Sequence, residues 1–323
     1  MNEPVSIVVP VFNESGNLTP LYQAIVEAME GLPFELVLVD DGSTDGSDKE
    51  IDVLCEQDER VKNVRFVRNY GQTAALTAGI RHSQHNILVT LDADLQNDPS
   101  DIPALLKKLD EGYDVACGWR RDRKDAWLTR TLPSRIANSL ISRLSKVYLH
   151  DYGCTLRAYR REFIEDIPLY GEMHRFIPIY VTWAGARLVE VEVKHHPRVR
   201  GESKYGLMRI PKVLLDLTTL KFLRDFYVTP IYFFGFVGFV LVLAGIAAGL
   251  IAAALWGPLN QPVLAACMTT VAPMLAIFGV VEITLGVIAE VLIRMHFDIR
   301  DKAPYRIRSL RNVETQDPPQ SGE

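Results

Sequence analysis

The sequence lacks the motifs of several common protein classes. It has no GxGxxG fingerprint and no GxxxxGK[ST] loop, which argues against a dinucleotide-binding protein and a P-loop nucleotidase. Only 4 of its 323 residues are cysteines, and none forms a CxxC pair, so we expect free thiols in a reducing compartment. The opening residues MNEPVSIVVPVF have no basic stretch before a long apolar run, so we expect no secretory signal there.

Charged side chains are absent from residues 226–281, although they make up 23% of the chain. A transmembrane helix needs about 20 apolar residues, so this stretch is long enough for two, with GPLNQP at 257–262 as the turn. We therefore predict a hairpin of two transmembrane helices at about 230–256 and 263–293. The alternative is a pair of core helices in a large soluble domain, but such helices normally have a polar face, and neither segment shows one.

Basic residues flank both ends of the hairpin but not its turn: Lys212, Lys221, Arg224, Arg294, Arg300 and Lys302. The positive-inside rule then predicts that the amino-terminal domain and both termini lie on the cytoplasmic side of the cell inner membrane. We divide the chain into a domain at 1–209, an amphipathic juxtamembrane segment at 210–228, the hairpin at 229–294 and a tail at 295–323. Glu282 lies inside the second span, so we expect it to face another helix, as in a homo-oligomer.

Before the hairpin, short strand-like runs alternate with helix-like segments. The strand-like runs are rich in β-branched residues and lie at 5–12, 34–41, 64–69 and 86–94. Helical patterns lie near 17–31, 46–58, 72–83 and 101–111. This alternation predicts an α/β fold with a mostly parallel sheet, and ligands of such sheets bind beyond the carboxyl ends of the strands.

Two acidic residues end the second strand-like run. Asp40 and Asp41 precede Gly42 and Ser43, an arrangement that lets a carboxylate accept hydrogen bonds from a base or ribose. The stretch DGSTDGS is also an ordinary turn and helix-cap sequence, so both interpretations stay open.

A second pair of acids ends the fourth strand-like run. Asp92 and Asp94, together with Gln96, supply oxygen ligands of the kind that Mg²⁺ or Mn²⁺ takes along with phosphate oxygens. The alternative duty for these acids is to cap the following helix. Ser100 and Asp101 can supply that cap, which leaves the pair free for a metal and a diphosphate.

Four ordered segments resemble the successive motifs of family 2 glycosyltransferases with the GT-A fold: VSIVVPVFNE, VDDGSTDGS, RNYGQTAALTAGI and LDADLQNDPSDIP. The hairpin narrows the resemblance to polyprenyl-phosphate glycosyltransferases, and the likeness runs through almost the whole chain. Three further segments are similar to undecaprenyl-phosphate 4-deoxy-4-formamido-L-arabinose transferases and related lipid-phosphate glucosyltransferases: EGYDVACGWR, DYGCTLRAYRR and GESKYG. The resemblance implies a Rossmann-like GT-A domain followed by membrane helices.

The resemblance also implies a donor site at the strand ends. Matched by position, the nucleotide-sugar site comprises Pro10, Phe12, Glu14, Val39, Asp41, Asp92 and Ala93, with Arg198, Ser203 and Lys204 on a loop that closes over the diphosphate. Asp94 and Gln96 match the ligands of a Mg²⁺ or Mn²⁺ ion. Family members commonly have Tyr at the position of Phe12, so a hydroxyl group is missing here while ring stacking is retained.

Residues 119–148 carry eight basic side chains against two acidic ones, in a chain whose net charge is −5. Guanidinium groups bind phosphate oxygens in a forked geometry, so this segment fits a lipid phosphate. The alternative is a surface that rests on anionic headgroups. By resemblance, Arg120, Arg130 and Ser134 contact the lipid phosphate.

The reaction that the resemblance implies is an inverting, metal-dependent sugar transfer. The donor is a nucleotide sugar, with UDP preferred, and the acceptor is the phosphate of a polyprenyl phosphate such as undecaprenyl phosphate, for lipopolysaccharide or another cell-envelope glycan. Asp92, Asp94 and Asp151 match the catalytic acids. Some members are proposed to use the acid at Asp151 as a base, yet it could equally orient Arg157 through an ion pair.

Other functions stay open on the sequence alone. A dolichyl- or polyprenyl-phosphate mannosyltransferase would use GDP-mannose, because a carboxylate can pair with guanine as well as with uracil. A processive polysaccharide synthase shares the sheet and the acid pair, but it usually carries a QxxRW motif and more spans, which this sequence lacks. A non-catalytic membrane scaffold would not need the ordered acids. We expect no nucleic-acid partner, and the sequence does not identify the sugar.

Overall fold

The computed structural model describes residues 3–121, 132–165, 167, 169, 171, 173–197, 222, 229–258 and 261–300. For 132–137 and 294–300 it describes the backbone only. The chain separates into two compact units, Met1–Leu217 and Thr218–Glu323. All four cysteines are free thiols, as the sequence predicts.

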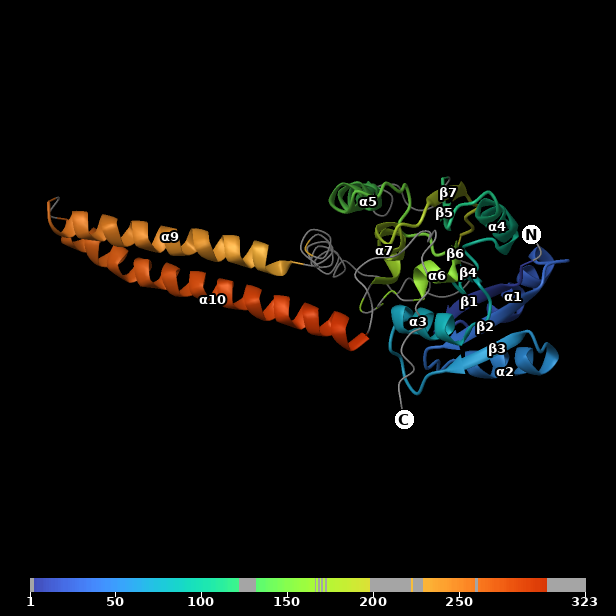
Figure 1. Cartoon of the computed structure of the whole chain (residues 1–323). Helices are drawn as coiled ribbons and strands as arrows, with labels where there is room; N and C mark the ends of the chain where they lie inside the picture. Colours follow the sequence, from blue (N-terminus) through green and yellow to red (C-terminus); the bar gives the residue numbers. More distant parts are fainter. Residues whose placement is uncertain are drawn as a thin grey trace, which may run out of the picture. The chain divides into compact units, whose positions relative to one another are not determined.

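The first unit is built around a seven-stranded sheet (Figure 1). Its strands, in the order β3-β2-β1-β4-β6-β5-β7, are β1 (Val5–Val11), β2 (Phe34–Asp40), β3 (Val61–Arg65), β4 (Ile87–Thr90), β5 (Val115–Trp119), β6 (Arg157–Arg160) and β7 (Leu188–Glu192). Strand β6 runs antiparallel to both β4 and β5, and the other pairs are parallel. The predicted mostly parallel sheet is therefore confirmed, with one reversed strand that the alternation of elements did not predict.

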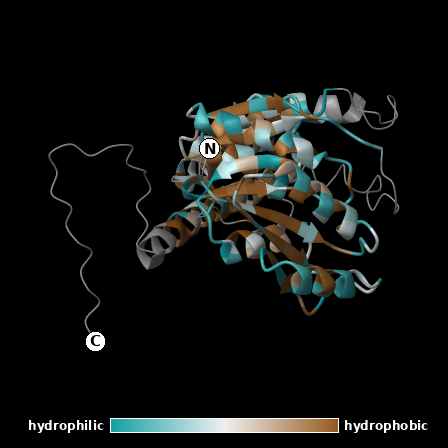
Figure 2. Ribbon diagram, turned by 90° about the vertical axis from the view of Figure 1, so that its right-hand side faces the viewer, coloured by the Kyte–Doolittle hydropathy of each residue, from teal (hydrophilic) through white to brown (hydrophobic). Residues whose placement is uncertain are grey.

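Helices cover both faces of this sheet, and apolar residues concentrate in its strands (Figure 2). They are α1 (Leu18–Ala28), α2 (Ser47–Gln57), α3 (Gln72–His82), α4 (Ile102–Asp110), α5 (Leu132–Ser145), α6 (Arg161–Ile164) and α7 (Ile177–Trp183), with 3-10 turns η1 (Pro99–Asp101) and η3 (Met173–Arg175). Side chains alternate along β1, so Ile7 belongs to the core under α1, whereas Val8 packs with Ala75 of α3. An added Cβ at Gly79 would lie 2.2 Å from Val8 Cγ1, so glycine lets α3 lie close to the sheet.

Strands β3 and β4 end before the predicted limits of 69 and 94. After Arg65 the chain turns back toward Asp41, whose carboxylate accepts the backbone N–H groups of Tyr70 and Gly71 at 2.6 and 2.9 Å. Strand β4 stops at Thr90, and Leu95 takes a left-handed φ of 58°. After both strands, polar residues at this edge bond to each other, as Gln72 does to Asp92 beyond β4.

The second unit contains α9 (Pro230–Trp256) and α10 (Pro262–Arg300), two apolar helices long enough to cross a membrane. Only 22% and 11% of their most apolar windows are buried, which argues against the alternative of core helices in a soluble domain. Small residues let the helices approach, because an added Cβ at Gly238 would lie 2.4 Å from the carbonyl oxygen of Gly279. The two helices form a candidate transmembrane hairpin.

A buried carboxylate links the first three strands of the sheet. Glu35 on β2 is 3% exposed and accepts hydrogen bonds from Ser6 Oγ on β1 and from the backbone N–H of Gln84, both at 2.5 Å. It also pairs with Lys62 on β3. Burial would raise the pKa of Glu35, but these partners outweigh burial and lower it.

We predict that Glu35→Gln lowers the free energy of unfolding by about 1–3 kcal/mol at pH 7, because Lys62 and Ser6 lose a charged partner. A carboxyl whose pKa is lowered in the folded state stabilises the fold at pH values above its pKa in the unfolded state, here 4.5. This stabilisation is lost as the pH falls through the pKa of the folded state. The difference between wild type and variant should therefore be constant near pH 7 and shrink in acid. Urea unfolding of the full chain in detergent measures it, and a difference that grows toward low pH would contradict this assignment.

Candidate active site

The carboxyl ends of β1, β2, β4 and β5 lie at one edge of the sheet. Strands β1, β2 and β4 are parallel neighbours, and β5 points the same way because β6 is antiparallel to both β4 and β5. This edge therefore gathers side chains that the sequence analysis selected: Phe12 after β1, Asp41 after β2, Asp92 and Asp94 after β4, and Arg120 after β5. We call it the carboxyl edge.

The loops after β1 and β2 are fixed to each other by hydrogen bonds. Ser43 Oγ accepts the backbone N–H of Asn13 at 3.0 Å, and Ser47 Oγ accepts that of Glu14 at 2.9 Å. Ser47 in turn donates its hydroxyl to Asp45 at 2.6 Å. The turn chemistry of DGSTDGS is therefore present, and it builds one wall of the carboxyl edge.

Asp41 is only 3% exposed, and its carboxylate already holds three donors. They are the backbone N–H groups of Tyr70 and Gly71, at 2.6 and 2.9 Å, and the Asn69 side-chain amide at 2.9 Å. Burial raises the pKa of Asp41, and the two backbone donors oppose this effect without cancelling it. A nucleotide would have to use the remaining acceptor positions of this carboxylate.

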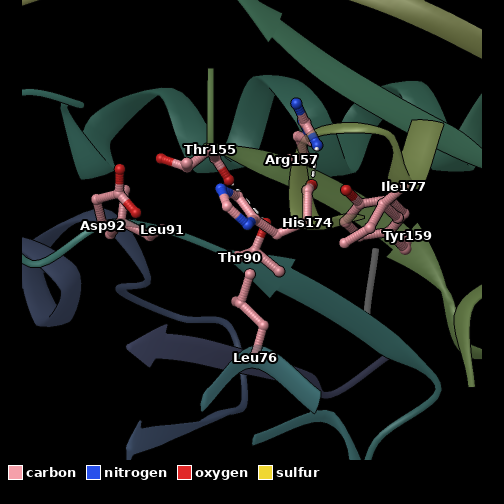
Figure 3. A pocket seen from close by; sticks show the side chains of 9 residues that line it. All are labelled: Leu76, Thr90, Leu91, Asp92, Thr155, Arg157, Tyr159, His174 and Ile177. Atoms are coloured by element: carbon pink, nitrogen blue, oxygen red, sulfur yellow. Dashed lines mark hydrogen bonds between the residues drawn. The ribbon is translucent and has the colours of Figure 1, made fainter. Parts of the chain in front are cut away.

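Asp92 and Asp94 lie on the short loop after β4. Asp92 Oδ1 accepts a hydrogen bond from Gln72, the first residue of α3, at 2.7 Å. Asp94 is 8% exposed and accepts the backbone N–H of Gln96 at 3.2 Å. Burial and the charge of Asp94 raise the pKa of Asp92, so the two carboxylates repel each other. Asp92 also lines a small cavity that reaches Arg157 (Figure 3).

This pair of carboxylates fits a hard divalent cation that keeps ligands from its substrate. Among the described residues, no three His, Cys, Asp or Glu side chains cluster as a metal site. Mg²⁺ is commonly held by one or two carboxylates together with substrate phosphates and water. A cation held by Asp94 would also offset the negative charge that helps to raise the Asp92 pKa. The residues present therefore fit Mg²⁺ or Mn²⁺ bound jointly with a diphosphate.

Arg120 and Asp151 form a buried ion pair at the carboxyl edge. Arg120 Nε and Nη2 donate to the two Asp151 oxygens at 2.7 and 3.0 Å, and the side chains are 10% and 3% exposed. Asp151 also accepts the backbone N–H of Gly153 at 3.0 Å. Arg157, the alternative partner considered for Asp151, donates instead to the carbonyl oxygen of Tyr152 at 2.7 Å.

The segment after the acids is held by Asp98. Its carboxylate accepts the backbone N–H of Ser100 at 2.9 Å and bonds to His196 Nε2 at 3.1 Å. Burial would raise the pKa of Asp98, but these hydrogen bonds lower it to about 2. Asp98 thus caps η1, and the expectation that Ser100 or Asp101 supplies a side-chain cap is wrong, because the side chain of Asp101 makes no capping bond.

The remaining selected residues fall into three groups. The side chains of Val39 and Ala93 are buried in the core, 0% and 3% exposed, so only their backbone can reach a ligand. Pro10, Phe12, Glu14 and Gln96 are partly exposed. Arg130, Arg198, Ser203 and Lys204 lie outside the described residues, and only the backbone of Ser134, within α5, is described.

Curated relatives match nearly the whole chain. Dodecaprenyl-phosphate galacturonate synthase of Rhizobium johnstonii is 38% identical, over 98% of this chain and 96% of its own length. Undecaprenyl-phosphate 4-deoxy-4-formamido-L-arabinose transferase of Edwardsiella ictaluri is 37% identical, over 95% of this chain and 94% of its own. The family model described as "Glycosyl transferase family 2" matches residues 6–168.

Solved structures share the fold of the first unit. Glucosyl-3-phosphoglycerate synthase from Mycobacterium tuberculosis, in complex with Mn²⁺ and UDP-glucose, matches with a TM-score of 0.52 at 20% identity, over 69% of this chain and 79% of that one. Its complex with Mg²⁺ and UDP matches with a TM-score of 0.53 at 19% identity, over the same shares. Together with the relatives and the family model, these likenesses show that the chain belongs to glycosyl transferase family 2, with a GT-A domain.

Proposed function

We propose that this glycosyltransferase moves a sugar from a nucleotide sugar to the phosphate of a membrane polyprenyl phosphate. The observation that carries the proposal is the charge distribution at the carboxyl edge: Asp92 and Asp94 follow β4, and the ion-paired Arg120 follows β5. The two curated relatives are named for polyprenyl phosphates. The candidate transmembrane hairpin supports an acceptor that is itself a membrane lipid.

The acidic part of the edge would bind the donor. When bound there, Mg²⁺ or Mn²⁺ neutralises charge on the departing nucleoside diphosphate. Asp94 and Gln96 would hold the ion, while Asp92 and Asp41 would orient the nucleotide sugar by accepting hydrogen bonds. From the family resemblance we also assign diphosphate contacts to Arg198, Ser203 and Lys204.

The basic part of the edge would bind the acceptor. A phosphate monoester has its second pKa near about 6, so a lipid phosphate is already an anionic nucleophile at neutral pH and needs no strong base. Asp151 accepts two hydrogen bonds from Arg120. Asp151 is therefore suited to orient that arginine toward phosphate oxygens rather than to take a proton. Arg130 and Ser134 would add contacts, and direct attack on the anomeric carbon would invert it.

The finer assignments belong to the same proposal. A UDP-linked donor is favoured by analogy with the fold neighbours, which were solved in complex with UDP compounds, and undecaprenyl phosphate is favoured by one relative's name. The basic flanks of the hairpin support an inner-membrane protein whose domain and termini are cytoplasmic. Glu282 within a span supports contact with a helix of a second copy.

The first test is transfer of radiolabel from UDP-sugars to undecaprenyl phosphate by the full-length protein, read as butanol-extractable lipid. Asp94→Asn should lower the rate at least about a hundredfold without unfolding the protein, and excess EDTA should abolish transfer, because the diphosphate would leave uncompensated. Asp52→Asn, which changes an exposed acid on α2, is the control and should leave the rate unchanged. Label in a polymer would indicate a synthase, and full activity in EDTA would contradict the metal role.

A second test separates the two functions considered for Asp151. Asp151→Asn should raise the KM for polyprenyl phosphate about ten- to hundredfold, because the lost charge-assisted bonds contribute about 1.5–3 kcal/mol to holding Arg120. The KM for the nucleotide sugar should change little. Glu192→Gln, which breaks the exposed neighbouring pair with Arg121, should change neither value. A fall in kcat with both KM values unchanged would show that Asp151 acts in the chemical step.

A further inference from the structure

Arg157 and Asp92 lie at the same end of the ladder formed by β4 and β6. In the antiparallel register Thr90 is the partner of Arg157. Asp92, two residues after Thr90, and Thr155, two residues before Arg157, lie in the loops just beyond these strands and line the same cavity as Thr90 and Arg157. Thr90 Oγ1 donates to the carbonyl oxygen of Thr155 at 2.7 Å. This hydrogen bond holds the end of β4 against the loop before β6, next to Asp92.

The two residues line one small cavity, together with Tyr159 and His174 (Figure 3). The cavity has a volume of ≈ 10 Å³, about enough for one water molecule. Among the described residues, Arg157 Nε and the Tyr159 hydroxyl are buried and have no hydrogen-bond partner. The cavity is therefore polar where it meets β6.

Arg157 is a buried cation to which no carboxylate in the described part of the chain is bonded. It is 3% exposed, and its Nη1 and Nη2 donate to the carbonyl oxygens of His174 and Tyr152 at 3.2 and 2.7 Å. Burial of a charge is costly unless an opposite charge compensates it. A neutral donor could satisfy the two carbonyl oxygens. Hydrogen bonding to the backbone therefore does not by itself explain why a charged side chain is buried at this position. The other buried arginine at this edge, Arg120, is already paired with Asp151.

We propose that Arg157 is a positioning residue of the transfer site. Across the cavity, its charge stabilises the negative charge of Asp92, which would orient the nucleotide sugar at the carboxyl edge. The inference rests on the proposed function, because that function assigns Asp92 to the donor. Gln72 holds the Asp92 carboxylate from α3, and Arg157 supports it from β6.

The test compares Arg157→Gln, which keeps a donor and removes the charge, with Arg157→Lys, which keeps the charge. Calorimetry on the full-length protein in detergent measures the affinity for UDP at saturating Mn²⁺. Arg157→Gln should weaken UDP binding about tenfold and Arg157→Lys less than about threefold, as expected for a charge acting across a short distance at low dielectric. Arg160→Gln is the matched control: Arg160 is on the same strand and donates to the carbonyl oxygen of Leu109 at 3.0 Å, and its loss should leave UDP binding unchanged.

A double-mutant cycle shows whether the effect passes through Asp92. In an Asp92→Asn background, Arg157→Gln should cost less than about threefold, because the neutral amide needs no counter-charge. Equal losses in the Gln and Lys variants, or an undiminished loss in the Asp92→Asn background, would overturn the inference. If Arg157→Gln does not fold, the affinity of Arg157→Lys for UDP decides alone. A tenfold loss of that affinity overturns the inference. A wild-type protein that does not bind UDP with Mn²⁺ would instead refute the UDP-linked donor of the proposed function, and the inference with it.

Discussion

Repulsion between carboxylates at one edge of a sheet is the constraint on which the site depends. Asp41 follows β2, Asp92 and Asp94 follow β4 on the other side of β1, and all three are buried or half-buried. Like charges repel strongly where water is excluded. The fold offsets this repulsion locally, with N–H donors on Asp41 and the Gln72 amide on Asp92. Arg120, just after β5, and Arg157, at the start of β6, oppose it from farther away. A cation that arrives with a diphosphate would complete the compensation, so the same charges that cost folding free energy favour binding.

Helix α3 connects the parts of this arrangement. The residues just before it donate to Asp41, and its first residue, Gln72, donates to Asp92. Its second residue, Thr73, bonds to the ring of His174 on η3, at the far side of the cavity. The glycine at 79 allows this helix to lie directly on β1, so its amino terminus is held at the carboxyl edge. A shift of α3 would therefore disturb both acids together.

Much of the architecture follows from patterns that a sequence displays. The β-branched runs predict β1 to β4 but not β5 to β7, and the long uncharged stretch predicts the apolar helices, because both patterns reflect burial away from water. The reversal of β6 has no such signal, since RAYR is too short to indicate direction. The partner of Asp151 is equally hidden: Arg120 lies 31 residues away, and only the sheet brings the two together. Matching by position also selected Val39, although its side chain faces the core.

Electron paramagnetic resonance of Mn²⁺ on the full-length protein, with and without UDP, measures most directly whether the carboxyl edge binds a metal and a diphosphate together. Two carboxylates provide few ligands by themselves, so Mn²⁺ should bind weakly alone and tightly with UDP, with hyperfine coupling to the phosphorus nuclei. Asp94→Asn should remove the bound signal. Mn²⁺ that binds equally well without UDP, shows no coupling to phosphorus, or is unaffected by Asp94→Asn would contradict a shared metal–diphosphate site at this edge.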